Sequence, residues 1–511
     1  MTRKYAPRFI SRFIIVAALV AVLFGLAQPS RAATITVAAG VVEIDGADGQ
    51  CSLIEAIINT NDDAATHSDC PAGNGADVIE LAAGALYEAT QNNYLGTALP
   101  TITDELIIEG ANATIAKVAA GNFRLMKNDV GNPLTIRDLI MEDGGAQSAS
   151  GGAIHNSGHL TISNGIFRGN NTLSSNTDGG AIYLGGADSS LTVINSTFEN
   201  NSAFQYGGAI YAAGGGAIKI IGSTFTDNLA TNGGRGGAVY YDGVDGARLE
   251  VRNSTFTGNK AHQRGGAVNV ASAVSDSVIA YSTFDNNEST NAGGGAVHVN
   301  QSADYFLFDH VTIINNTAAS AGGGISGGKM HVLFSTIEGN SANYGGALGP
   351  DGDFIVTQTA IIANNAAQSG GAISISNAFA GRIQGTVKNS EISQNTAGVD
   401  GGAFRSEGNS DVTISHSTIS GNRADNKAGG IYVGGSSTDQ GTLQSSFNSI
   451  VSNSASLGAG GFYLDNDSEM TMRNTVLVDN TTDDIALYPS TCESLGTFTS
   501  SGYNRYPASA N

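Results

Sequence analysis

GGAIHNSGHLTISNGIFRGN, residues 151–170, contains both ends of a unit that recurs nearly to the C-terminus. The unit starts with Gly-Gly-Ala-Ile and ends with Phe-x-x-Asn. Its Gly-Gly pairs begin at Gly151, Gly179, Gly207, Gly236, Gly265, Gly294, Gly323, Gly345, Gly370, Gly401, Gly429 and Gly460. Its anchors, each with Asn three residues later, are Phe167, Phe198, Phe225, Phe256, Phe284, Ile313, Ile337, Ile361, Ile392, Ile419, Ile450 and Leu477. The mean interval of about 28 residues indicates stacked repeats.

The positions seven and five residues before each anchor are apolar in most copies, as in Leu160 and Ile162 or Leu191 and Val193. This period of two predicts a strand with one face turned inward. The anchor has the opposite parity, so the chain must bend between them, at pairs such as Ser196-Thr197, Ser254-Thr255 and Ser417-Thr418.

A second bend is expected at each Gly-Gly pair, because a residue without Cβ adopts positive φ easily. The residue after the Ala that follows, such as Ile154 or Ile182, then starts a third strand. Three short strands and three turns make one coil of a single-stranded right-handed parallel β-helix, with about 12 to 16 coils in all. Coils stacked about 4.8 Å apart place each anchor Asn above the next, so we expect an amide ladder along the axis.

Composition agrees with a β-rich chain of repeats. The 511 residues include 69 Gly and no Trp, only 14% are charged, and 41% are hydrophobic. A repeat array need not divide into domains, because each unit contacts only its neighbours. The formal net charge of −21 disfavours nucleic acid and anionic membranes as partners.

Residues 1–32 contain five basic residues and no acidic one, around an apolar run of 14 residues from Phe13 to Leu26. With Ser30-Arg31-Ala32 after it, this pattern predicts a secretory signal peptide cleaved after Ala32. An uncleaved N-terminal anchor is the alternative. No later apolar run is long enough for a transmembrane helix.

Export would allow the cysteines to oxidise. Cys51 and Cys70 lie 19 residues apart and predict a disulfide that closes an N-terminal loop. Cys492 is then a free thiol or an intermolecular link. A zinc site is the alternative, since His67 lies near Cys70.

The N-terminal segment predicts a strand over residues 34–42 and a short helix over residues 53–59. Ser52 is placed to cap this helix, with Glu55 as its capping-box partner. The helix would cover the open end of the stack, where an unpaired sheet edge invites aggregation.

CSLIEAI, ADVIELAAGALYEAT, LTIRDLIMEDGGA and the repeats together resemble secreted bacterial proteins with a "CSLREA" segment on a parallel β-helix. The repeat is similar to that of chlamydial polymorphic outer membrane proteins, and SSGYN at residues 500–504 resembles a C-terminal signature of such proteins. Ile54 stands where the family usually has Arg. The resemblance implies an adhesin at the cell surface, although few residues follow Leu477, so the family's C-terminal autotransporter barrel is not expected.

Four regions follow: a signal peptide (1–32), an N-terminal cap with the first coils (33–110), the β-helix repeats (111–482) and a C-terminal cap or tail (483–511). Length differences between coils must lie in outer loops, where function concentrates. The longer loops are at residues 185–190, 242–246, 434–441 and 465–468.

Parallel β-helices also include polysaccharide lyases and glycoside hydrolases. Asn176-Thr177-Asp178 and Arg382-Ile383-Gln384 resemble parts of a polygalacturonase site. Seven coils separate them, about 34 Å, so they cannot form one site. Asp178 is interpreted as a turn residue beside a repeat glycine pair.

No pair among the eight histidines has zinc-helix spacing; His310 and His416 stand three residues before an anchor and are expected in turns. The acidic turns at residues 242–245, 351–353 and 465–467 offer too few oxygens for a built Ca²⁺ site, so no cofactor is predicted and Ca²⁺ is the one ion considered.

Two functional hypotheses remain. The first is a monomeric, non-catalytic protein, secreted or held on the bacterial outer surface, that binds a surface protein or a glycan. The second is a lyase or hydrolase of extracellular acidic polysaccharide, which requires carboxylates from neighbouring coils to converge within about 10 Å.

Overall fold

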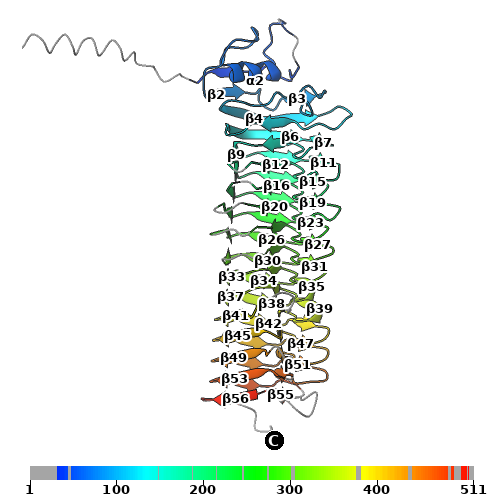
Figure 1. Ribbon diagram of the computed structural model, residues 1–511, viewed down its shortest axis with the longest axis vertical. Helices are drawn as coiled ribbons and strands as arrows, with labels where there is room; N and C mark the ends of the chain where they lie inside the picture. The colour runs from blue at the N-terminus through cyan, green and yellow to red at the C-terminus, as the bar shows by residue number, and fades with distance from the viewer. Residues whose placement is uncertain are drawn as a thin grey trace, which may run out of the picture.

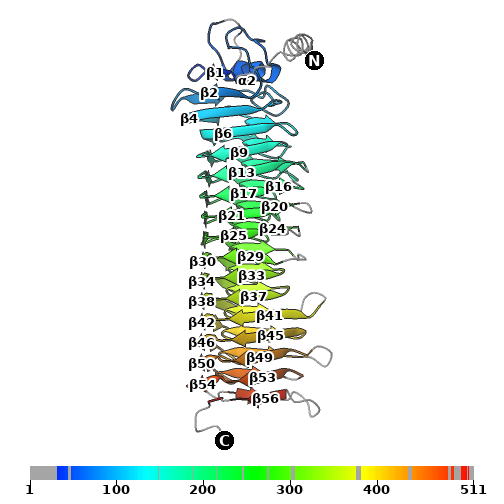
Figure 2. The ribbon, with the colours of Figure 1, turned by 90° about the vertical axis from the view of Figure 1, so that its left-hand side faces the viewer.

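The computed structural model describes residues 32–43, 46, 48–147, 149–186, 188–214, 216–243, 247–272, 276–300, 305–375, 381–435, 440–465, 467–481, 485–487, 497–502 and 504–505. The predicted signal peptide, except its last residue, and Cys492 lie outside these ranges. The described chain forms one long rod of stacked coils, with the N-terminal cap at one end (Figures 1 and 2). Every strand pairs in parallel with its equivalents in the adjacent coils, so the predicted parallel β-helix is confirmed.

One coil consists of β9 (His159–Ser163), β10 (Ile166–Arg168), β11 (Asn171–Thr172) and β12 (Ile182–Gly185). The first two belong to a sheet of 30 strands (sheet A), β11 to a sheet of 12 (sheet B), and β12 to a sheet of 14 (sheet C). The prediction of three strands per coil was therefore wrong by one. A two-residue strand turns only one side chain inward, so it leaves no alternation in the sequence.

Sheet C runs the length of the rod and positions the candidate site. Its strands are β5 (Met126–Asn128), β8 (Ile154–Asn156), β12, β16 (Ile210–Ala213), β20 (Val239–Asp242), β24 (Val268–Val270), β28 (Val297–Val299), β32 (Ile325–Gly327), β36 (Leu348–Pro350), β40 (Ile373–Ile375), β44 (Phe404–Glu407), β48 (Ile431–Gly434), β52 (Phe462–Leu464) and β55 (Ile485–Leu487). Fourteen strands fall within the predicted range of coils.

The bend between the two sheet A strands lies one residue earlier than predicted. Asn195, Asn253 and His416 have φ of 48°, 50° and 51°, so the left-handed residue precedes the Ser-Thr pair. The serine then accepts a hydrogen bond from the coil before it, as Ser196 Oγ does from Gly165 N at 3.0 Å. Asn and His tolerate positive φ better than most residues do, which places the bend on them.

The glycine turn is confirmed, with Gly151 at a φ of 78°. In three coils the turn begins one residue before the predicted pair, at Gly322, Ala428 and Ala459, as the pairing of Ile325, Ile431 and Phe462 along sheet C requires. In these three coils the residue directly before the sheet C strand is glycine in place of the usual Ala, at Gly324, Gly430 and Gly461. A run of small residues therefore shifted the apparent pair.

The core is continuous, and the predicted inward residues such as Leu160, Ile162 and Phe167 are buried. Phe167, Phe198, Phe225, Phe256 and Phe284 stack face to face at centroid distances of 4.7 to 4.9 Å.

The predicted asparagine ladder is confirmed over all twelve anchors. Each amide Nδ2 donates to Oδ1 of the next Asn at 2.9 to 3.0 Å. The ladder runs through Asn170, Asn201, Asn228, Asn259, Asn287, Asn316, Asn340, Asn364, Asn395, Asn422, Asn453 and Asn480.

The N-terminal cap covers one end of the stack (Figure 2). The first strand, β1 (Thr34–Thr36), is shorter than predicted because the chain turns at residues 38–41. Helix α2 (Leu53–Asp62) has the predicted capping box from Ser52 and Glu55 and extends three residues beyond the predicted end. A disulfide joins Cys51 to Cys70, whose Cα atoms are 4.7 Å apart. Within the described ranges, no helix is long and apolar enough to cross a membrane.

Candidate ligand-binding face

One outward position of sheet C changes its residue from coil to coil. This position is the second residue of each strand, directly after the buried first residue. We call the residues at this position the outward column. Its members in register are Lys127, His155, Tyr183, Tyr211, Tyr240, Asn269, His298, Ser326, Gly349, Ser374, Arg405, Tyr432 and Tyr463. The parallel register brings side chains about 28 residues apart in sequence onto one strip of surface.

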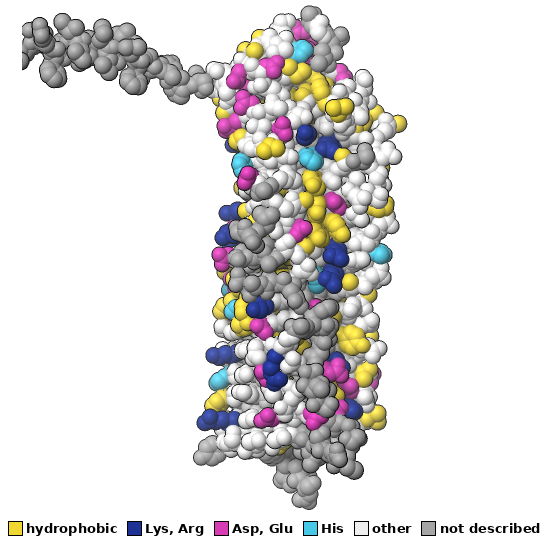
Figure 3. Space-filling model, viewed as in Figure 1, with side chains coloured by type: hydrophobic (Ala, Val, Ile, Leu, Met, Phe, Trp, Pro, Cys, Tyr) yellow, Lys and Arg dark blue, Asp and Glu magenta, His cyan; other side chains and the backbone are white. Residues whose placement is uncertain are grey.

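Four tyrosines gather in the N-terminal half of this strip, and we call them the tyrosine patch: Tyr183, Tyr211 and Tyr240 of the column, and Tyr206 beside it. Tyr211 lies 5.5 Å from Tyr183 and 5.1 Å from Tyr240 between ring centroids, and both pairs are tilted by about 45°. Tyr206 comes from the turn before Gly207 and stacks on Tyr240 at 4.6 Å. Figure 3 shows a stripe of hydrophobic side chains at this place, with basic and His side chains above and below it.

Three tyrosines of the patch, Tyr183, Tyr211 and Tyr240, have raised pKa values and remain neutral over the physiological range. Burial raises the pKa of Tyr240 to about 12, helped by the carboxylate of Asp242, and burial beside Asp178 raises that of Tyr211 further. Asp178 is the turn residue that the sequence predicted: its Oδ1 accepts a hydrogen bond from Tyr206 N at 3.0 Å. The hydroxyl groups can therefore both donate and accept hydrogen bonds.

A pocket of about 780 Å³ lies beyond the N-terminal end of the patch. We call it the Arg124 pocket. Arg124, Lys127 and His155 line it on one side, and the loop around Tyr94 lines it on the other. Burial and the Arg124 guanidinium lower the pKa of His155 to about 4, so this ring is neutral at pH 7.

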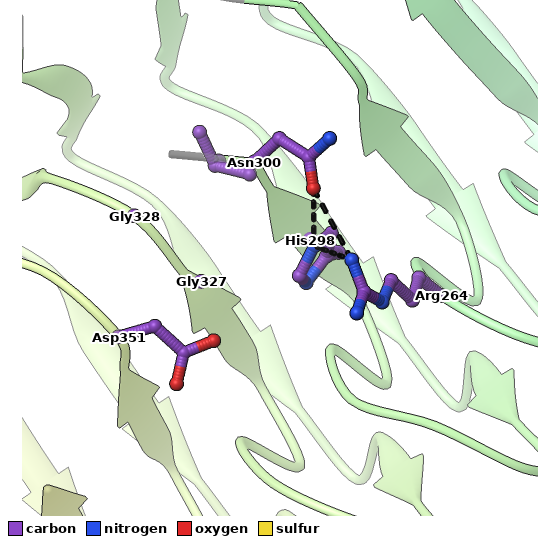
Figure 4. A pocket seen from close by; sticks show the side chains of 7 residues that line it. Arg264, His298, Asn300, Gly327, Gly328 and Asp351 are labelled. Carbon is purple, nitrogen blue, oxygen red and sulfur yellow. Dashed lines mark hydrogen bonds between the residues drawn. The ribbon is translucent and has the colours of Figure 1, made fainter. Parts of the chain in front are cut away.

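A second pocket, of about 350 Å³, lies beyond the other end of the patch (Figure 4). We call it the His298 pocket. Arg264 Nη1 donates to Asn300 Oδ1 at 3.2 Å and lies 3.4 Å from His298 Nε2. Nδ1 of the same ring is 2.8 Å from Ser326 Oγ. Asp351 faces this group from the opposite wall.

Two groups of the His298 pocket have shifted pKa values. Burial, with Arg264 beside it, lowers the pKa of His298 to about 3. Burial raises the pKa of Asp351, and Arg264 partly opposes this. Shifted titratable groups in a cleft are typical of functional sites, although structural networks produce them too.

The residues that resembled a polygalacturonase site do not come together. Asp178 lies beside the tyrosine patch, whereas Arg382 lies directly before β41 (Ile383–Lys388) of sheet A and forms a two-point ion pair with Asp411 of that sheet. His310 and His416 occupy the left-handed bend, as predicted, with φ of 52° and 51°. Among the described residues, no three His, Cys, Asp or Glu side chains gather as metal ligands would.

The sequence prediction missed the whole outward column. Its signal was present as Gly-Gly-Ala-Ile-Tyr at Tyr183 and Tyr211 and Gly-Gly-Ala-Val-Tyr at Tyr240. The two pockets left no such signal, because Arg264, His298 and Asp351 come from three coils.

The comparison with known protein families agrees with the fold. The family described as "Right handed beta helix region" matches residues 107–284. This match covers part of the chain, and together with the parallel pairing of the coils it identifies the fold as a right-handed parallel β-helix.

Two known proteins are similar to parts of this chain. The probable autotransporter YfaL of Escherichia coli K12 is 33% identical over 129 residues, which are 23% of this chain and 10% of that protein. The chain thus matches only a tenth of this relative's length. PfbA, a surface adhesin of Streptococcus pneumoniae, has a crystal structure that aligns over 82% of this chain and 86% of its own, with 11% identity and a TM-score of 0.28.

Proposed function

We propose that this protein binds an extended glycan along the outward column of sheet C and has no catalytic activity of its own. The observation that carries the proposal is the tyrosine patch, with a polar pocket beyond each of its ends. Tyrosine combines a large rigid ring with a polar tip, so it contributes contact area at little cost in conformational entropy.

The spacing of the patch favours a polymeric ligand. Coils repeat every ~4.8 Å along the rod, so a chain of sugars lying parallel to the axis meets equivalent ring contacts in successive coils. Several weak contacts on one chain raise the overall affinity above that of each contact alone. The rims of both pockets carry amide groups, such as Asn92 and Asn300, that suit sugar hydroxyls.

A location outside the cell fits this function. The basic and apolar start of the chain predicts export. A segment of the chain is similar to a probable autotransporter. The resemblance of the repeat to polymorphic outer membrane proteins points the same way. We therefore place the protein among secreted or surface-held proteins with an adhesin-like role.

The test is retention of the purified protein on a panel of immobilised polysaccharides, for wild type, Tyr211→Ala and Tyr281→Ala. Tyr281 is the matched control, since it is an exposed tyrosine that stacks on a histidine at the sheet A bend, away from the outward column. We expect Tyr211→Ala to weaken the best ligand at least about tenfold and Tyr281→Ala to change nothing. Equal affinity of all three proteins would refute the proposal.

Cleavage of an acidic polysaccharide is the second candidate function, and the His298 pocket is the observation that favours it. A neutral histidine faces a carboxyl group of raised pKa there, as an acid and base pair would require. Release of unsaturated uronate or reducing sugar, abolished by Asp351→Asn, would establish this activity. Unchanged product release in that variant would exclude the pocket as its site.

A further inference from the structure

The Arg124 pocket contains a buried cation that the described protein does not neutralise. Arg124 is 7% exposed, and its Nε has no hydrogen-bond partner. No described carboxylate lies within ion-pair distance of its guanidinium. A buried charge without a partner is costly, so a site that keeps one has a use for it.

The repeat shows how unusual this arginine is. Met126 pairs with Ile154, so Arg124 holds the position that Gly152 has in the next coil. A Cβ on Gly152 would lie 2.3 Å from the carbonyl oxygen of Gly180, so the inner coils exclude any side chain there. Only at this end of the stack does the position carry a long basic side chain.

Lys127 adds a second positive charge on the same wall. It is half-buried on β5, directly beside His155 of β8. No hydrogen bond or ion pair of its ammonium group is present among the described residues. The nearby carboxylates are engaged elsewhere or outside the lining: Glu43 accepts hydrogen bonds from Thr90 and Asn93, and Asp129 is not part of the pocket wall.

The opposite wall is held in place by the backbone of Arg124 itself. Arg124 N donates to Gly96 O at 3.0 Å, and Ala98 N donates to Arg124 O at 2.9 Å. Asn92 Oδ1 accepts from Gly96 N at 2.6 Å, which closes the loop. The pocket is therefore preformed, which lowers the entropic cost of binding.

We propose that the Arg124 pocket binds an anionic group, carboxylate or sulfate, carried by a sugar at one end of the glycan that lies on the tyrosine patch. The inference rests on the proposed glycan binding. A guanidinium fork pairs with either oxyanion in two-point geometry, and Lys127 supplies a point charge beside it. Asn92 and Asn93 line the pocket beside these cations, where their amide groups can meet the sugar hydroxyls.

The test measures binding of single sugars to the full-length secreted protein by ligand-observed NMR. The probes are glucuronate, glucose 6-sulfate, glucose and inorganic sulfate. The proteins are wild type, Lys127→Gln, Arg124→Gln, Arg124→Lys and, as the matched control, Lys260→Gln, whose lysine pairs with Glu288 on sheet B. We expect glucuronate or glucose 6-sulfate to bind more tightly than glucose. Lys127→Gln and Arg124→Gln should each weaken that binding about tenfold, and Lys260→Gln should not.

Thermal unfolding shows which variants fold. If Arg124→Gln does not fold, the binding of Lys127→Gln and Arg124→Lys tests the proposal in its place. Equal binding of glucose and the anionic sugars overturns the proposal, as does binding of inorganic sulfate alone or unchanged affinity in Lys127→Gln. Single sugars do not need the tyrosine patch. Anionic-sugar binding without polysaccharide retention thus refutes the proposed function but supports the pocket, and the reverse result refutes the pocket alone.

Discussion

The asparagine ladder and the outward column are two axial rows of the same rod, built by the same parallel register. In the ladder every coil contributes the same residue, and each amide bonds to the one above. In the outward column the residue varies along the rod, from Lys127 through three successive tyrosines to His298. The ladder position, which keeps the same residue, stabilises the stack. The outward column, which varies in residue, is available to bind a ligand.

The difference has a physical cause. Each ladder asparagine must satisfy buried backbone groups as well as its neighbour, as Asn287 does by donating to Phe256 O at 3.0 Å and accepting from Asn259 N at 3.0 Å. A substitution leaves several buried polar groups unpaired. The outward column has no such obligation, because the strand backbone beneath it is already paired within sheet C.

The largest effect is expected from Phe225→Ala compared with Tyr211→Ala. Phe225 is fully buried between two stacked rings, at 4.8 and 4.7 Å. Its removal leaves a cavity and should lower the free energy of unfolding by about 4 kcal/mol. Tyr211 is half-buried, so its removal should cost less than half as much while reducing glycan binding. Chemical denaturation and hydrogen exchange of the affected coils measure the two losses of stability. Equal destabilisation would remove the distinction between the buried rows and the outward column.

A closer match compares two asparagines, Asn287 of the ladder and Asn269 of the outward column, each 1% exposed. Asn287→Ala should cost about 3 kcal/mol, because it removes the acceptor of the Asn259 side-chain amide and a donor to the carbonyl of Phe256. Asn269 Oδ1 has no hydrogen-bond partner. Asn269→Ala should therefore change the free energy of unfolding by less than about 1 kcal/mol. A large loss for Asn269→Ala would show that the outward column is structural as well.

The same contrast explains which features the sequence could predict. Buried rows were predictable, because inward positions such as Phe167 and ladder positions such as Asn170 recur with little change, and a repeated residue reveals its period. The turn at Gly322 was misplaced by one residue, because a third glycine made two alignments equally good.

The outward column and its pockets were not predictable in the same way. Apart from the runs of tyrosine, the residue differs from coil to coil, so no period marks His155 or His298. The Arg124 pocket also depends on the loop around Tyr94, which lies in the cap and has no counterpart in the repeat. Such sites can be recognised only when the register shows which side chains of different coils are neighbours.

The contribution of His298 to the pH dependence of stability is a smaller effect. The pKa of His298 is about 3 in the folded protein, against about 6.5 when unfolded. The unfolded chain thus binds more protons between these values, so stability is complete above pH 6.5 and falls as the pH is lowered toward 3. At pH 5 the loss should be about 2 kcal/mol.

His298→Asn should reduce this slope, since Asn269 shows that an asparagine fits the same register position one coil earlier. Denaturation at pH 7 and pH 5 measures the change. An identical slope in the variant would mean that His298 is protonated in the folded protein.

The smallest effect is expected at an exposed row that is neither packed nor part of the candidate face. Lys260 pairs with Glu288 of the next coil at 2.7 Å on sheet B, and both side chains are largely exposed. Such a pair contributes at most about 0.5 kcal/mol, and salt screens it. Lys260→Gln should therefore alter neither the denaturation midpoint nor glycan retention. If Lys260→Gln weakens retention as much as Lys127→Gln does, attraction by the overall charge explains the binding, and the Arg124 pocket does not. The two lysines carry the same charge in stacked strands but lie on different sheets.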